Sequence, residues 1–118
     1  MGEKAFKLRT KRFALDVLAL VEAMPKSVAG RVMGRQPIRC ATSVGANRQA
    51  ACRAESTTDM LSKLATVEEE ADGSACWLEV MVEGSLIAPE PVANTLHEAN
   101  ELTAMIVASR KTLQTRNA

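Results

Sequence analysis

Apolar residues recur every three or four positions in four separate stretches of this 118-residue chain. That spacing places side chains on one face of an α-helix, whereas a half-buried strand needs strict alternation. The chain also has only 3% aromatic residues and no Tyr, which disfavours a β-sandwich built from aromatic and β-branched residues. The pattern therefore predicts an all-α protein.

Helix-breaking residues, among them the prolines, predict where these helices begin and end. We expect helices over about 8–24, 28–54, 58–83 and 91–115. Pro25 ends the first helix, because the residue before a proline is pushed out of the α region. Pro37 predicts either a kink in the second helix or a short helix before it and a new one after it. With short connections, residues 1–118 form one domain, an antiparallel up-and-down four-helix bundle.

The helix faces that carry the repeat are expected to form the core. In the first helix these are Phe13, Val17, Leu20 and Met24, with Leu15, Leu18 and Val21 widening the stripe; in the third, Met60, Leu64, Val67, Ala71, Leu78 and Val82; and in the fourth, Val92, Leu96, Ala99, Leu102 or Thr103, Ile106 and Leu113. Gly73, in the middle of the third helix, costs about 1 kcal/mol relative to Ala. A glycine there indicates a close contact with a neighbouring helix.

Charge is divided unequally between the two halves of the chain. Residues 1–54 carry eleven Lys or Arg against three acids, a net +8, and residues 55–118 carry four against eleven, a net −7. One interpretation is a basic face that binds a ligand. The other is that the two halves neutralise each other, within one fold or across a subunit contact.

The basic residues of the second helix form a candidate surface for nucleic acid or for a neighbouring subunit. Arg31, Arg35 and Arg39 lie at a spacing of four, and Arg48 and Arg53 extend the basic character. Such a stripe can follow phosphates, although no aromatic platform for base stacking accompanies it. The alternative is pairing with acids of the third helix, where Glu69, Glu70 and Asp72 form a candidate acidic interface.

Small and polar residues predict a packing motif in the second and third helices. Ser43 and Asn47 share one helix face, with Gly45 between them and Trp77 on the next helix. Small residues allow close helix approach, and a Ser–Asn pair can fix the register by hydrogen bonding. We favour a structural role over a ligand site for these four residues.

Cysteine and histidine usage gives no sign of a catalytic or metal site. Cys40, Cys52 and Cys76 include no CxxC pair, and His97 is the one histidine, so a zinc pattern is absent. Each cysteine lies in a helical stretch, where a free thiol usually behaves as a small buried hydrophobe. We expect no catalytic residue, no cofactor, no metal and no enzymatic activity. A reducing cytoplasm fits the odd cysteine count, and no stretch is apolar enough to span a membrane.

Several short motifs together resemble a known bacterial family. They are Gln36, Arg39, ATSVGAN (41–47), AES (54–56), Asp59, Lys63, Glu70, WL (77–78), EANEL (98–102) and ASRKT (108–112). The chain resembles the four-helix-bundle proteins encoded in intervening sequences of 23S ribosomal RNA genes, which are similar to the accessory protein of diversity-generating retroelements. The resemblance implies a cyclic homo-oligomer, a pentamer in relatives. For the retroelement branch it implies binding to nucleic acid and a reverse transcriptase.

The chain departs from that family's pattern at four positions. Ala50, Glu69, Gly73 and Cys76 stand where the family commonly has Glu, Lys, Glu and an aromatic residue. These changes move charge around the motif.

These observations predict a cytoplasmic, non-enzymatic scaffold or adaptor that assembles with itself and associates with RNA, DNA or a reverse transcriptase, but not with membranes. The alternative is a sequence-independent nucleic-acid-binding protein that uses the basic half. A third option is a small-molecule or metal binder in the bundle core.

Overall fold

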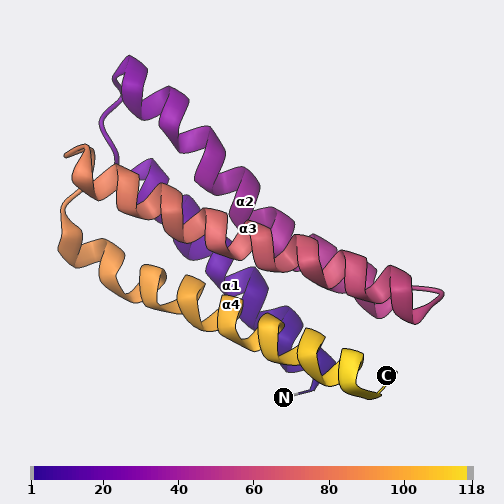
Figure 1. The fold of residues 1–118 in the computed structure, drawn as a ribbon. Helices are drawn as coiled ribbons and strands as arrows, with labels where there is room; N and C mark the ends of the chain where they lie inside the picture. The colour runs from indigo at the N-terminus through magenta and orange to yellow at the C-terminus, as the bar shows by residue number, and fades with distance from the viewer. Residues whose placement is uncertain (1, 117–118) are drawn as a thin grey trace.

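The computed structural model describes residues 2–116, and the predicted four-helix bundle is confirmed (Figure 1). The helices are α1 (Glu3–Glu22), α2 (Val28–Cys52), α3 (Thr57–Glu83) and α4 (Pro89–Arg116). They form an elongated bundle of 49 × 22 × 21 Å. The start of α1 and the end of α4 lie toward the same end of the bundle (Figure 1).

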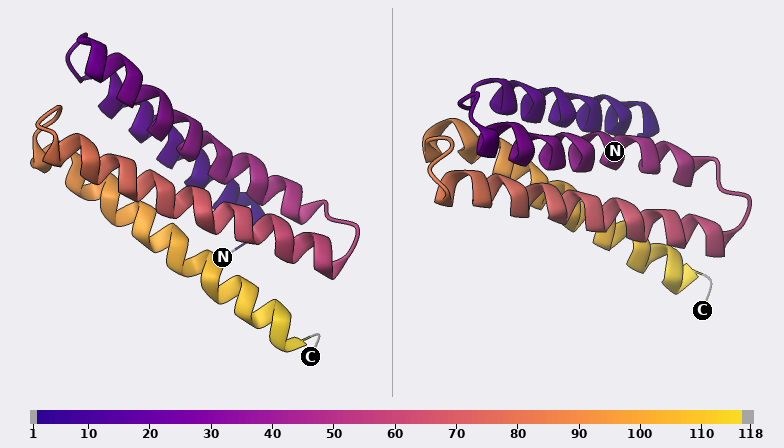
Figure 2. Two further views of the ribbon diagram at one scale, coloured as in Figure 1. Left: turned by 45° about the horizontal axis from the view of Figure 1, so that its top comes forward. Right: turned by 90° about the horizontal axis from the view of Figure 1, so that it is seen from above.

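The helices pack in a ring of neighbours in which one junction is much thinner than the others. The α2–α3 and α3–α4 contacts are extensive, the α1–α2 contact is smaller, and α1 meets α4 over a short stretch (Figure 2). A charged clamp closes this last junction: Arg9 donates to both carboxylate oxygens of Glu98, at 2.6 and 2.7 Å. The Glu98 carboxylate in turn raises the pKa of Arg9. A bidentate pair of this kind fixes geometry as well as adding attraction.

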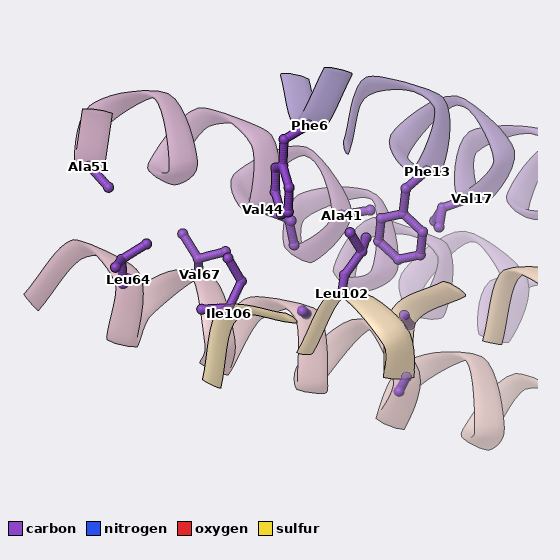
Figure 3. Packing of buried hydrophobic residues seen from close by; sticks show 13 residues of the cluster. Phe6, Phe13, Val17, Ala41, Val44, Ala51, Leu64, Val67, Leu102 and Ile106 are labelled. Atoms are coloured by element: carbon purple, nitrogen blue, oxygen red, sulfur yellow. The ribbon is translucent and has the colours of Figure 1, made fainter. Parts of the chain in front are cut away.

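The core consists of the inward faces of all four helices (Figure 3). Phe13, Val17, Leu78, Leu102 and Ile106 are buried as predicted. Of the two alternatives in α4, Leu102 is buried and Thr103 lies at the edge.

The prediction that Leu15 and Leu18 face inward is wrong, since they are 55% and 42% exposed. They lie on the side of α1 turned away from Phe13 and Val17. Phe6 and Thr10 complete the buried stripe instead. This stripe extends further because α1 begins at Glu3, five residues before the predicted start.

The ends of the helices follow from local capping. Ser27 accepts a hydrogen bond from the Gly30 N–H at 3.1 Å, and Ser56 accepts one from the Asp59 N–H at 3.0 Å. Each serine satisfies one of the backbone donors left open at a helix start. Pro37 lies inside α2, which is one continuous helix, so the alternative of two separate helices is wrong. A bend of the helix axis at Pro37 stays a prediction.

Gly30→Ala and Gly73→Ala are expected to change the free energy of unfolding in opposite directions. A Cβ at Gly30 would overlap the Pro25 carbonyl oxygen, a backbone atom that cannot turn away, so we expect a loss of about 1–3 kcal/mol. A Cβ at Gly73 would lie 3.4 Å from the Cys40 sulfur, an ordinary contact. Relief of the glycine penalty should then stabilise α3 by up to about 1 kcal/mol. Urea denaturation followed by circular dichroism measures both; equal shifts would contradict the packing described.

The three thiols are expected to react at different rates in the folded protein. Cys40 is 2% exposed, whereas Cys76 is exposed, which corrects the expectation that every cysteine is buried. Burial raises the pKa of Cys40 above its ordinary value of 9.0, and the Glu70 carboxylate adds to the effect. Because the thiolate is the reactive form, Cys40 should react about tenfold or more slowly than Cys76 with a disulfide reagent at mildly alkaline pH.

Cys76→Ser should remove the fast phase of that reaction, and unfolding in urea should make all thiols react alike. The raised pKa of Cys40 also means that the folded state holds its proton where the unfolded state has lost it. Stability should therefore decline as pH rises past about 9. A fast phase that persists when both Cys52 and Cys76 are replaced by Ser would show that Cys40 is accessible.

Candidate interaction surfaces

An apolar stripe covers the side of α1 that points away from the bundle. Leu8, Leu15 and Leu18 form this outer α1 stripe, and Leu8 is 60% exposed. At the start of α2, Val28 and Val32 are 70% and 59% exposed. Leu15 and Leu18, at a spacing of three, are neighbours on the helix surface, and grouped exposed apolar side chains mark an interaction site more often than isolated ones do. α1 thus carries two apolar faces, of which its own bundle buries one.

The predicted arginine stripe is divided by the fold into three environments. Arg31, Arg35 and Arg53 are exposed and form no ion pair with any of residues 2–116. Arg39 pairs with Glu70 of α3, with Nη1 and Oε2 3.0 Å apart. Within residues 2–116, the alternative of pairing between the second and third helices therefore holds at Arg39 alone among these arginines.

Arg48 leaves the stripe and turns toward α1. Its guanidinium lies 4.9 Å from the centre of the Phe6 ring and donates to the Cys52 sulfur. A guanidinium over an aromatic face is held by the ring's quadrupole. Sequence reasoning missed this contact because Phe6 lay outside the predicted first helix.

The acidic residues of α3 lie mainly on its outer face. Glu69, Asp72, Glu79 and Glu83 are exposed there together with Val80, which is 40% exposed; we call this set the outer α3 face. None of its four acids pairs with a base within residues 2–116. Glu70 is not part of the face, because its carboxylate is mostly covered where it meets Arg39.

The residues of the predicted packing motif contact other residues of the same chain. Asn47 donates its side-chain N–H to both the hydroxyl and the carbonyl of Ser43, at 2.7 and 3.0 Å. The pair therefore clasps one helix rather than joining two. Gly45 faces α1, where an added Cβ would lie 3.1 Å from the Thr10 hydroxyl. Trp77 is half-buried on α3, and Gly73 faces Cys40 of α2.

The remaining polar groups pair along the helices or between neighbours. His97 meets Glu101 one turn further along α4, at 2.7 Å, and its side chain is 75% exposed. Arg110 donates to Glu68 across the α3–α4 junction at 2.9 Å. Within residues 2–116, no cluster of three or more His, Cys, Asp or Glu is placed to hold a metal ion. Over the same residues, none of the helices has the length and apolar character needed to cross a bilayer.

Comparison with known proteins identifies the family. The family model described as 23S rRNA-intervening sequence protein matches residues 5–108. A protein with unknown function from the S23 ribosomal protein family of Bacteroides thetaiotaomicron VPI-5482 has a similar solved structure, with a TM-score of 0.79 and 26% sequence identity. The match covers 89% of this chain and 97% of that one. Among curated proteins, none matches significantly. The chain belongs to the family of 23S rRNA-intervening sequence proteins.

Proposed function

We propose that this protein is a non-enzymatic scaffold or adaptor that assembles with copies of itself in the cytoplasm. One observation carries the proposal: the outer α1 stripe is apolar, exposed and flanked by bases, whereas the outer α3 face is acidic and unpaired. Exposed leucines on a small protein favour burial against a partner. A second copy of the same chain can be that partner, because the basic surface of one copy can face the acidic surface of the next.

The two surfaces require a heterologous contact. α1 and α3 do not pack against each other within the described bundle, so their outer faces lie on different sides of one subunit. A contact that joins two different faces repeats from copy to copy, and it closes into a ring if the rotation permits. The family resemblance favours closure with five copies. The basic side of this contact includes Arg31 and Arg35, which are exposed and unpaired within residues 2–116, whereas Arg39 pairs with Glu70.

Leu15→Glu is expected to dissociate the assembly. The substitution puts a charge where the proposed contact would bury an apolar side chain, and losing the burial of one leucine weakens each contact by about 1.5–3 kcal/mol, or roughly ten- to hundredfold. Light scattering coupled to size-exclusion chromatography gives the mass of wild type and variant. Asn100→Glu, at an exposed position of α4, is the matched control and should keep the wild-type mass. A wild-type monomer at micromolar concentration and moderate salt would refute the proposal.

The charge pairing has its own test in a double-mutant cycle. Arg35→Glu should weaken the assembly, and Asp72→Arg on the same chain should partly restore it, because the reversed charges attract again across the contact. Both side chains are exposed and unpaired within the subunit, so folding should be unaffected. Additive losses in the double variant would place these two residues in separate environments.

Nucleic acid is the second candidate partner, favoured by the exposed, unpaired Arg31, Arg35 and Arg53. RNA or DNA, alone or with a nucleic-acid enzyme such as a reverse transcriptase, would then bind this side. Affinity for a mixed-sequence single-stranded RNA should fall steeply with salt, and replacing all three arginines by Ala should lower the salt slope by up to about 0.7 per lost phosphate contact. Filter binding over a salt series measures this. No binding at the lowest salt would exclude this candidate.

A further inference from the structure

The bundle has an open end because α1 is the shortest helix. α1 has 20 residues, whereas α2, α3 and α4 have 25, 27 and 28. The start of α1 lies well short of the turn that joins α2 to α3 (Figure 2). The last turns of α2 and α4 and the first turns of α3 therefore lack a fourth helix to cover them.

A cavity of about 500 Å³ occupies the uncovered end. Its apolar lining includes Ala51 and Leu64, which are 1% and 5% exposed, together with Met60, Ala108 and Leu113. The hydroxyl residues Ser109 and Thr112 and the thiol Cys52 add polar atoms. Its volume lies within the range of about 300–1,000 Å³ of small-molecule sites, which combine an apolar wall with a few polar groups.

Charge at this cavity is unbalanced. Arg48, Arg116 and Glu3 are its charged lining residues. Arg48 is half-buried, and its guanidinium contacts the Phe6 ring and the Cys52 thiol, neither of which is a carboxylate. A partly desolvated guanidinium interacts most favourably with an anion that can accept its hydrogen bonds. The site thus places the guanidinium of Arg48, positioned by Phe6 and Cys52, next to an apolar volume.

We propose that this cavity binds an amphipathic monoanion, a carboxylate with an unbranched aliphatic tail. The carboxylate pairs with the free donors of Arg48, and the tail fills the apolar volume lined by Leu64 and Met60. All lining residues of the site come from one chain, so ligand binding can be tested whether or not the self-assembly proposed above occurs.

Sodium decanoate is the probe, with decanol as the uncharged match, and isothermal titration calorimetry as the measurement. Decanoate should bind saturably at one site per chain, and decanol should bind about tenfold or more weakly because it cannot pair with the guanidinium. Arg48→Met keeps an apolar side chain over Phe6 and should weaken decanoate binding by a similar factor while leaving decanol unchanged.

Two tryptophan variants locate the ligand. Ala108→Trp puts a large side chain into the cavity and should abolish decanoate binding, whereas Ala104→Trp, one turn away on α4 and outside the cavity lining, should not. Both positions are exposed, and circular dichroism checks that each variant folds. The proposal is overturned if decanoate gives no saturable binding, if decanol binds equally well, or if Arg48→Met and Ala108→Trp bind like the wild type.

Discussion

The close contact between α2 and α3 determines the arrangement of the other parts of this bundle. α2 presents small side chains to its neighbours, among them Cys40, Ala41 and Ala51, all nearly inaccessible to solvent. On α3, Gly73 lies against the Cys40 sulfur, at a distance that would leave an ordinary contact for an added Cβ. α1 then packs on the far side of α2 and α4 on the far side of α3. Cys40, Ala41 and Ala51 of the second helix are therefore used in packing within the bundle.

This contact also determines which charges remain available. Most bases lie in α1 and α2 and half of the acids lie in α3, but the α2–α3 seam brings only Arg39 and Glu70 together as an ion pair among residues 2–116. Burying further charges in the seam would require removing their hydration, which costs several kcal/mol per ion. Arg31 and Arg35 on one side and Glu69 and Asp72 on another therefore stay in solvent. The net charge of +1 thus conceals two separate surfaces of opposite sign.

The sequence was sufficient for the helices and the core, but not for the surfaces. Phe13, Val17 and Ile106 follow a helical repeat that only a helix buries on one side. Leu15 and Leu18 widen the same apolar stripe, and periodicity alone cannot show which face is buried when a helix is apolar on two faces. The width of the stripe was the sign in the sequence that this helix has a second apolar face. The assignment of Arg48 to the arginine stripe failed for another reason: its partner Phe6 lies near the start of the chain, far from Arg48 in the sequence. Contacts between distant segments and the relative lengths of helices are properties of the assembled bundle.

α1 makes less contact with the rest of the bundle than any other helix does. It carries the outer α1 stripe and borders the open-ended cavity. Beyond its packing on α2, it meets α4 at a thin junction, where Arg9 pairs with Glu98 and, at 3.5 Å, with Glu101. A helix with few contacts opens more readily than one at the centre of a core. Any partner that binds the packed form of α1 therefore stabilises it. Because binding couplings are reciprocal, a copy bound at Leu15 and a ligand held by Arg48 over Phe6 would each favour the state that the other recognises.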